Sequence, residues 1–189
     1  MPNAVRALIV ALVLLSCAGA RAQTTDGKAA LCSGCHGSSG VPADPSIPVI
    51  WGQNEGYIYF QLRDFKAGAR KSAIMGPMTA TLDKQAMLDL AAYFAAKPWP
   101  NLAIPAAPGD VARQAERINE SAGCKGCHGG EWRGDGTTPR VSGQNLAYLR
   151  QSMILFRTGE RANNPWMTAL LKTYPDTDIE TMARYIAGY

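Results

Sequence analysis

Histidine is nearly absent from this chain, which has only His36 and His128 among its 189 residues. The 19 lysines and arginines form no basic run, and removing Arg6 and Arg21 of the N-terminal leader lowers the formal net charge of +4 by two. Nothing resembles the strongly positive face that nucleic-acid binding needs, so we expect no nucleic-acid partner. Any metal site in this chain therefore has at most two imidazoles available as ligands.

Cysteine is also scarce, and none is left over for a disulfide. Of the five cysteines, Cys17 lies in the leader and the others form two Cys-x-x-Cys pairs, each followed by a histidine: Cys32, Cys35, Cys124 and Cys127. Cys-x-x-Cys-His is the attachment signal of c-type haem. Residues three apart on a helix share a face, so both thiols can reach one porphyrin while the histidine binds its iron. The pattern predicts two covalently bound haems c, with His36 and His128 as axial ligands.

Two other interpretations of the cysteine pairs explain less of the sequence. Zinc binds paired cysteines, but a zinc site gives no reason for a histidine directly after each pair or for methionines at matching positions. A dithiol redox motif of the thioredoxin type expects a βαβ setting, and the sequence shows no such pattern of strands.

The N-terminus has the pattern of an export signal. Arg6 gives a short positive region, Ala7 to Leu15 form an apolar region, and Ala20-Arg21-Ala22 is a cleavage site. The apolar region is shorter than the roughly 20 residues that cross a bilayer. We expect residues 1–22 to be a signal peptide and the mature protein to work in the periplasm. Two alternatives stay open: a lipid anchor at Cys17, because Leu14-Leu15-Ser16-Cys17 resembles a lipoprotein box, and a retained N-terminal anchor.

The rest of the chain is a tandem repeat. The cysteine pair, the histidine, a methionine and a tyrosine return in this order at an offset of 92 residues. Between them, further landmarks return at an offset of 91, such as Gly52-Gln53-Asn54 and Gly143-Gln144-Asn145. Prolines bracket the junction and interrupt any helix there, so we place the boundary near Ile104. The prediction is a first domain over residues 23–104 and a second over residues 105–189.

Each half is predicted to be all-α, with three helices. Capping residues followed by apolar side chains at helical spacing place the helix starts near Asp26, Asn54 and Asp83, and near Asp110, Asn145 and Asp176. A domain of about 80 residues has a modest core, so we expect a buried haem to hold each half together.

Two groups of side chains receive no catalytic role. The basic residues after the middle helix of each half are expected on a solvated surface, with contact to haem propionates or to a docking partner as the alternative: Lys66, Arg70, Lys71, Arg157 and Arg161. The four tryptophans do not repeat in register. We expect them to be packing or haem-edge aromatics: Trp51, Trp99, Trp132 and Trp166.

A methionine is the expected sixth ligand of each iron, because no spare histidine exists and His/Met ligation raises the reduction potential. Met75 lies 39 residues after His36, and Met167 lies 39 residues after His128, whereas Met78 fits neither this interval nor the spacing to the following tyrosine. We therefore expect Met75 and Met167 to be the ligands. Pro48 and Pro139 follow the histidines on loops, where a carbonyl can accept the hydrogen of the other ring nitrogen.

The chain resembles the dihaem cytochromes c of the cytochrome c4 group, which consist of two class I cytochrome c domains. The resemblance covers essentially the whole mature chain and rests on these segments: Cys32 to Gly37, Gly52-Gln53, Phe65-Lys66-Ala67-Gly68, Met75-Gly76-Pro77-Met78, Ala91-Ala92-Tyr93-Phe94, Cys124 to Gly129, Ser142-Gly143-Gln144, Phe156-Arg157-Thr158-Gly159 and Met167. In that group the first methionine of such a pair binds the iron, which agrees with the choice of Met75.

The resemblance implies one-electron transfer in the bacterial periplasm and no enzymatic activity. It implies redox protein partners, with a quinol-oxidising complex as an example of a donor and a terminal oxidase as an example of an acceptor, and peripheral membrane association is a further option. The alternative function is that of a cytochrome subunit in a larger dehydrogenase, such as a flavocytochrome sulfide dehydrogenase or an alcohol dehydrogenase. A dihaem peroxidase fits poorly, because both irons have a methionine in register.

Overall fold

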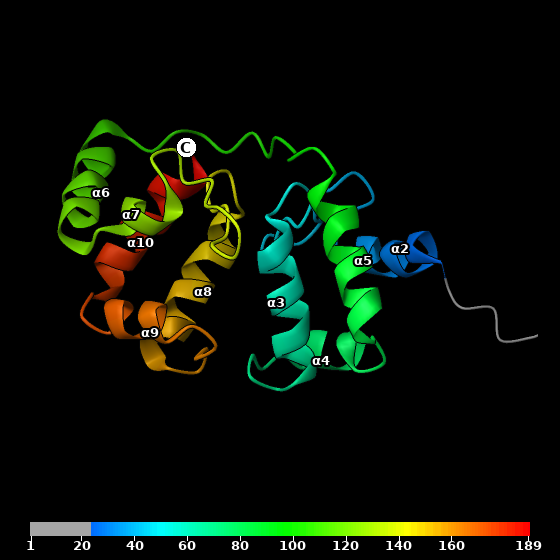
Figure 1. The fold of residues 1–189 in the computed structure, drawn as a ribbon. Coiled ribbons are helices and arrows are strands. Elements are labelled where there is room, and N and C mark those ends of the chain that lie inside the picture. The colour runs from blue at the N-terminus through cyan, green and yellow to red at the C-terminus, as the bar shows by residue number, and fades with distance from the viewer. Residues whose placement is uncertain (1–23) are drawn as a thin grey trace, which may run out of the picture.

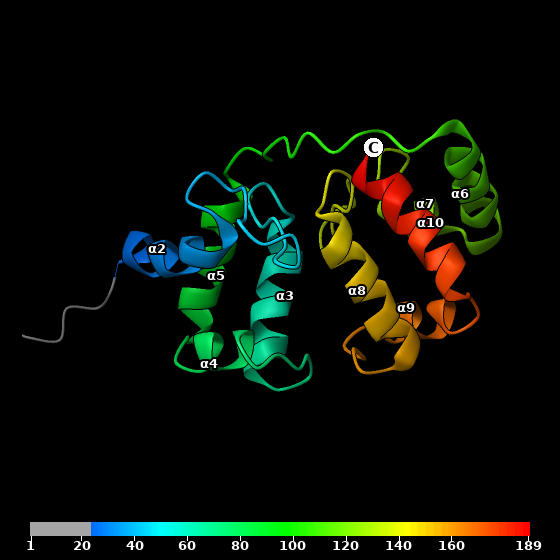
Figure 2. The same cartoon turned by 180° about the vertical axis from the view of Figure 1, so that it is seen from behind.

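The chain folds into two helical domains that lie side by side (Figures 1 and 2). The computed structural model describes residues 24–189, so the predicted signal peptide and Cys17 lie outside the described residues. Residues 24–189 contain no β-strand, in agreement with the all-α prediction. Their helices are, in order, α2 (Thr25–His36), α3 (Glu55–Lys66), α4 (Met75–Thr79), α5 (Lys84–Ala95), α6 (Gly109–Ala122), α7 (Cys124–His128), α8 (Leu146–Thr158), α9 (Pro165–Leu171) and α10 (Asp176–Ala187).

Each domain has its own apolar core, formed where the last helix of the domain packs on two others. In the first domain α5 packs against α2 and α3, around Ala29, Ile58, Leu90, Ala91 and Phe94. In the second, α10 packs against α6 and α8, around Ala115, Ile118, Trp132, Leu149, Met182, Ala183, Ile186 and Ala187. The two clusters share no residue, which is the arrangement that the tandem repeat predicts.

The predicted helix starts are close to the observed ones, but the capping differs at several of them. The side chain of Thr24, not of Asp26, accepts the hydrogen bond of the first turn of α2. Asp83 caps α5 as expected by accepting from Ala86 N–H at 2.7 Å. Asn54 and Asn145 stand at the N-cap positions of α3 and α8 without making a cap bond. Their side chains reach the other domain instead.

The structure has three short helices in addition to the three helices predicted in each half. α4 and α9 carry the methionine segments, and α7 carries the second cysteine pair. α7 is separate because Gly123, with φ of +67°, adopts the left-handed conformation that ends α6. In the first domain the same region is one continuous helix, α2, in which Leu31 precedes the cysteine pair.

The segment over residues 97–108 connects the domains along one edge of the molecule (Figure 1). Trp99 in this segment lies against the second domain, with the guanidinium carbon of Arg140 4.4 Å from the centre of its ring. Further along, Ile104 packs against the core of the second domain. The domain boundary near Ile104 stays a prediction.

Candidate haem sites

The first Cys-x-x-Cys-His motif forms the last turn of α2. His36 is buried, with 7% of its surface exposed, while Cys32 is partly exposed and Cys35 is exposed. Gly37 ends the helix with φ of +88°, and a Cβ at this position would lie 2.2 Å from the carbonyl oxygen of Val41. A glycine is therefore required after the histidine, because the following loop folds back onto the motif.

The second motif forms the whole of α7. Cys124 and His128 are partly exposed and Cys127 is exposed, so the order of burial within the cysteine pair is the same as in the first domain. Gly129 follows the histidine with φ of +77°, in the place that Gly37 has in the first domain. Each motif therefore turns one thiol towards its domain and leaves the other thiol at the surface.

Both histidines are oriented by the carbonyl of a proline, as predicted. The Nδ1 of His36 lies 2.8 Å from the oxygen of Pro48, and the Nδ1 of His128 lies 3.1 Å from the oxygen of Pro139. Because a carbonyl oxygen accepts only, Nδ1 is the donor and Nε2 keeps its lone pair for a metal. Burial lowers the pKa of both histidines and outweighs the opposing effect of these hydrogen bonds. The neutral imidazole is the form that binds iron.

The inner thiols have the opposite response to burial. Burial raises the pKa of Cys32 and of Cys124, which disfavours the thiolate that a zinc site or a dithiol redox centre uses. Within residues 24–189, moreover, His, Cys, Asp and Glu side chains form no group of three or more that could hold a metal ion. The zinc interpretation is left without a complete set of ligands in the described part of the chain.

The two methionines make equivalent hydrogen bonds through their backbone N–H groups. Met75 N–H donates to Ser72 Oγ at 3.0 Å, and Met167 N–H donates to Asn164 Oδ1 at 3.1 Å. In both cases the acceptor side chain lies three residues before the methionine; Asn164 is the N-cap of α9, whereas Ser72 lies two residues before the N-cap of α4, Ile74. Both methionines are partly buried. Met78 follows a full turn later and is 44% exposed. Met75 and Met167 thus share a hydrogen bond that Met78 lacks, because Met78 N–H donates to Ile74 O instead.

Buried donors without partners fit the acidic side chains of a haem. The indole Nε1 atoms of Trp51 and Trp132 and the Nε of Arg157 are buried and have no hydrogen-bond partner in the protein. Buried donors are normally paired, and haem propionates are carboxylates that can accept from them. A small apolar cavity lies beside Cys124; it is lined by Ile118, Ala122, Cys124, Met153, Leu170, Leu171, Tyr174, Asp178, Ile179 and Met182. The residues present therefore fit the predicted group.

The prediction of a solvated surface for the basic residues is wrong for Arg161 and does not describe Arg70. Arg161 is 6% exposed and donates to the hydroxyl of Tyr57 at 3.1 Å, and Arg70 donates to the hydroxyl of Tyr148 at 3.0 Å. Both bonds cross between the domains. The two bonds are equivalent in the repeat, because Arg70 and Arg161 are 91 residues apart and so are Tyr57 and Tyr148. Arg161 is buried and Arg70 is partly buried because each binds the tyrosine of the other domain.

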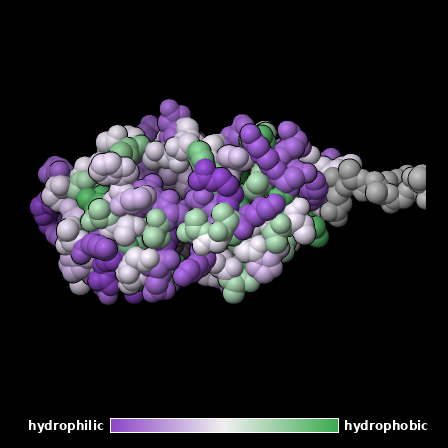
Figure 3. Space-filling model, turned by 60° about the horizontal axis from the view of Figure 1, so that its bottom comes forward, coloured by the Kyte–Doolittle hydropathy of each residue, from purple (hydrophilic) through white to green (hydrophobic). Residues whose placement is uncertain are grey.

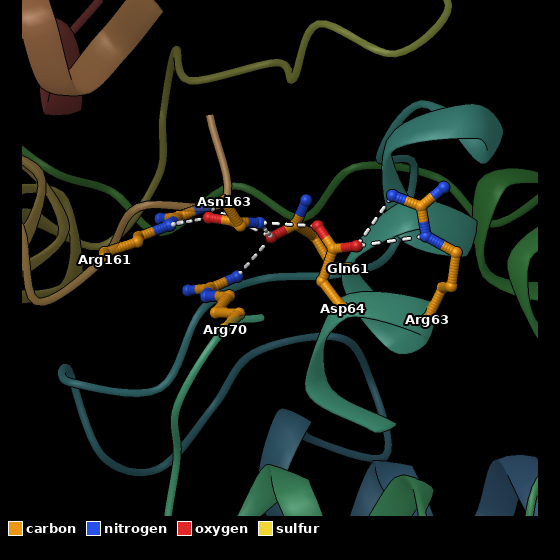
Figure 4. A network of polar contacts seen from close by, with 6 residues as sticks. All are labelled: Gln61, Arg63, Asp64, Arg70, Arg161 and Asn163. Carbon is orange, nitrogen blue, oxygen red and sulfur yellow. Dashed lines mark hydrogen bonds and ion pairs between the residues drawn. The ribbon is translucent and has the colours of Figure 1, made fainter. Parts of the chain in front are cut away.

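Gln61 and Asp64 join these arginines into one polar network (Figure 4). Gln61 Oε1 accepts from Arg70 at 2.8 Å and from Arg161 at 3.2 Å. Asp64, which is 5% exposed, accepts from Arg63 in its own domain and from Asn163 of the other domain, both at 2.8 Å. A buried network is stabilising when all of its members are paired, so this cluster fixes how α3 and α8 face each other.

Two helical domains, each with a Cys-x-x-Cys-His helix end and a proline-bound histidine, define a dihaem c-type cytochrome. No protein-family model matches the chain. It is 34% identical to cytochrome c4 of Azotobacter vinelandii over 97% of this chain and 98% of that protein. It also superimposes on the crystal structure of reduced recombinant cytochrome c4 from Pseudomonas stutzeri, with a TM-score of 0.77, 31% identity and coverage of 87% of this chain and 96% of that one. The chain belongs to the cytochrome c4 family.

Family membership settles the class of activity. The protein is an electron carrier, not an enzyme, and its cofactors are two covalently bound haems c. It exchanges electrons with other redox proteins. The chain is also 32% identical, over 97% of its length, to a protein of Stutzerimonas stutzeri named thiosulfate dehydrogenase electron acceptor, of which it covers 92%. None of the helices in residues 24–189 combines the length and apolar character that crossing a membrane requires.

Proposed function

We propose that Cys32 and Cys35 hold one haem through thioethers and that Cys124 and Cys127 hold the other. His36 and Met75 are the axial ligands in the first domain, and His128 and Met167 are those in the second. The observation that carries this assignment is the pair of histidine to proline hydrogen bonds, because they leave both Nε2 atoms free for iron. The matched hydrogen bonds of Met75 and Met167 support the choice on the other side.

The side chains keep their positions while electrons move. When bound, each haem supplies a one-electron couple between ferric and ferrous iron. Met75 with His36, and Met167 with His128, would hold each iron through a thioether and a neutral imidazole in both oxidation states, so an electron would arrive without exchange of a protein ligand. Pro48 and Pro139 hold the rings in one orientation, and no residue has to give or take a proton. The exposed thiols of Cys35 and Cys127 place one edge of each attachment site at the surface, where a partner can approach.

We infer a periplasmic location from the predicted signal peptide over residues 1–22, with a quinol-oxidising complex as donor and a terminal oxidase as acceptor. A second partner class is a dehydrogenase that passes electrons to this protein. The named thiosulfate dehydrogenase acceptor is the observation that favours it, since that relative aligns along nearly the whole chain. In the first case the protein is a free carrier, and in the second the dehydrogenase holds it as a cytochrome subunit. The domain boundary near Ile104 is part of the same proposal.

A redox titration of the mature protein, followed by ligand-sensitive spectroscopy, tests the ligation. We expect two covalent haems by mass spectrometry, both low-spin with His/Met ligation in the oxidised and reduced states. A five-coordinate or high-spin haem in the resting protein would contradict the assignment. Purification from the native membrane and periplasm fractions tests the partners: a dehydrogenase that co-purifies in stoichiometric amount favours the second partner class, and the mass of the N-terminus shows whether Cys17 carries a lipid.

A further inference from the structure

Each domain inserts one glutamine side chain into the other domain. Gln144 Oε1 accepts from Val49 N–H at 2.8 Å, and its Nε2 donates to Val49 O at 2.9 Å. Gln53 does the same in reverse: its Oε1 accepts from Arg140 N–H at 2.8 Å, and its Nε2 donates to Arg140 O at 2.9 Å. Both glutamines are almost fully buried, with exposures of 2% and 4%.

The two contacts are equivalent within the repeat. The glutamines are 91 residues apart, and so are the residues that they bind. In both side chains the amide orientation follows from the neighbours, because Oε1 also accepts from the N–H of the next residue, Asn54 or Asn145, at 2.9 Å. The asparagines add parallel bonds across the interface, to Thr138 O at 2.7 Å and Ile47 O at 2.6 Å.

The bonded N–H groups belong to the peptides that orient the histidines. Val49 N–H and Pro48 C=O are the two ends of one peptide group, and Pro48 O accepts from His36. A chain of hydrogen bonds therefore runs from His36 through this peptide to Gln144 of the other domain. The same chain runs from His128 through the peptide between Pro139 and Arg140 to Gln53.

Such a chain transmits an electrostatic effect to the ligand. A hydrogen bond at a peptide N–H polarises the group and makes its carbonyl a better acceptor, and the effect is larger in a buried site. Val49 is 1% exposed, so water does not replace the glutamine there. A stronger acceptor at Nδ1–H makes the imidazole more basic. A more basic imidazole favours ferric iron and lowers the reduction potential.

We propose that Gln144 is a positioning residue for the haem of the first domain and that Gln53 is one for the haem of the second. Each domain thereby helps to set the reduction potential of the haem in the other domain. This inference rests on the proposed roles of His36 and His128 as axial ligands. It goes beyond those roles by assigning a function to interdomain contacts that involve neither histidine directly.

Replacement of each glutamine by methionine, in the full protein with both haems, tests whether each glutamine affects the haem of the other domain. Gln144→Met keeps the side-chain volume but removes the acceptor of Val49 N–H, so the potential of the first-domain haem should rise relative to the second. Gln53→Met should do the reverse. NMR signals of the axial methionines, followed through a redox titration, report each haem separately. We expect the ratio of electron occupancy between the haems to change by roughly two- to fivefold, where tenfold corresponds to about 59 mV.

Asn163→Ala is the matched control, because it removes interdomain bonds to Gln61 and Asp64 without touching either proline peptide. It should leave the occupancy ratio unchanged. The proposal would be overturned if the reduction potential shifts only in the haem of the substituted domain, shifts equally in both haems or does not shift. An equal response of the occupancy ratio to Asn163→Ala would overturn it as well. If the unmodified protein does not show low-spin His/Met spectra, the result instead rejects the ligation on which the proposal rests.

Amide hydrogen exchange keeps the test decisive if a methionine variant does not fold with both haems. In the unmodified protein, the amides of Val49 and Arg140 should exchange slowly in both oxidation states, since each donates to a buried glutamine. Gln144→Asn, which is shorter by one methylene, should speed exchange at Val49 across the interface, and Gln53→Asn should do so at Arg140. Fast exchange at either amide in the unmodified protein would contradict the proposal.

Discussion

The two domains share one frame but place a tryptophan at different positions of the loop after the histidine. In the first domain Trp51 lies against the turn after His36, where a Cβ on Gly40 would lie 2.7 Å from its indole ring. In the second domain the large and small residues are exchanged: Trp132 stands at the turn and Ser142 takes the place of Trp51. The turns correspond, because Gly40 N–H donates to Gly37 O and Trp132 N–H donates to Gly129 O, both at 3.1 Å.

We infer from this exchange that one indole fills equivalent space in the two domains from different positions in the sequence. Gly40 has φ of +82° and Trp132 has φ of +57°, so the second domain holds a bulky residue in the left-handed region. Such a conformation is uncommon for a large side chain and persists where the surroundings enforce it. Trp132 is 1% exposed, and its backbone oxygen accepts from Val141 and Ser142 N–H.

A second difference lies between the cysteines of each pair, where the first domain has Ser33 and the second has Lys125. Lys125 Nζ pairs with Glu116 at 2.9 Å and lies 5.5 Å from the ring centre of Trp132. Glu116 also accepts from the hydroxyl of Tyr185. The second attachment motif therefore carries a neutralised charge pair that the serine of the first motif cannot form. Equal covalent attachment is thus combined with unequal surroundings.

The largest expected effect comes from removing a proposed ligand, which tests whether the methionine sides of the two domains are equivalent. Met75→Ala should convert the haem of the first domain to a form without methionine ligation, with a lower reduction potential, because the thioether that favours ferrous iron is gone. Met167→Ala should do the same to the second haem alone. Spectroscopic redox titration measures both. Met78→Ala is the control and should leave both haems low-spin; loss of methionine ligation in that variant would reverse the assignment.

Next in size is the exchange of the tryptophan. Trp51→Ser alone should lower the free energy of unfolding by about 3–5 kcal/mol, as deletion of a large aromatic side chain does. Gly40→Trp alone should also be destabilising, by about 1–3 kcal/mol, because its side chain meets Trp51. The double variant recreates the arrangement of the second domain and should be more stable than Trp51→Ser alone. Urea unfolding of the four proteins gives the coupling energy, and additive costs would show that the two sites do not share one space.

A smaller effect is expected at Glu116, where the second domain has its charge pair. Hydrogen bonds from Tyr185 and Lys125 lower the pKa of this carboxyl, so the folded state holds the negative charge more readily than the unfolded state does. The resulting stability is present at neutral pH and is lost as the pH falls below the usual glutamate value of about 4.3 towards the lowered one. The pair is partly solvent-exposed, which limits its contribution to less than about 1 kcal/mol.

Urea unfolding at several pH values checks this sign. Glu116→Gln should be less stable than the unmodified protein at pH 7, and the difference should shrink in acid. Glu180→Gln is the control, since it removes a half-exposed ion pair with Arg150 at 2.7 Å. A difference between Glu116→Gln and the unmodified protein that grows on acidification would contradict the account.

The sequence predicts what is local and misses what forms between the domains. Adjacent residues define the attachment motifs, and a short loop carries the carbonyl of Pro48 to His36, so both could be inferred from spacing. Arg161 and Gln144 could not be placed in this way, because their partners lie 104 and 95 residues away. A single arginine after a helix is usually solvated. Its recurrence with a tyrosine at the same offset was the available signal, and it indicates that two copies of one surface face each other.

The smallest effect on the domains themselves is expected at the surface beside the methionines, where a substitution should change docking of a partner but not the reduction potentials. Ile74 and Trp166 directly precede Met75 and Met167, are equivalent in the repeat and are 67% and 86% exposed. Figure 3 views the molecule from the end that carries α4 and α9, where green patches are small and separated by hydrophilic side chains. We therefore expect the exposed indole of Trp166 to be a contact for a redox partner on this end.

Trp166→Ala should slow electron exchange with a partner protein by roughly two- to tenfold, which corresponds to about 1 kcal/mol of docking free energy. Ile74→Ala should have a smaller effect, because isoleucine offers less contact area than an indole. Stopped-flow reduction by a partner cytochrome or dehydrogenase measures both rates, and the reduction potentials should not change, since neither side chain is a proposed ligand. If Trp166→Ala shifts the potential of the second haem, the residue acts on the site itself, and the difference between the domains extends from their interiors to their surfaces.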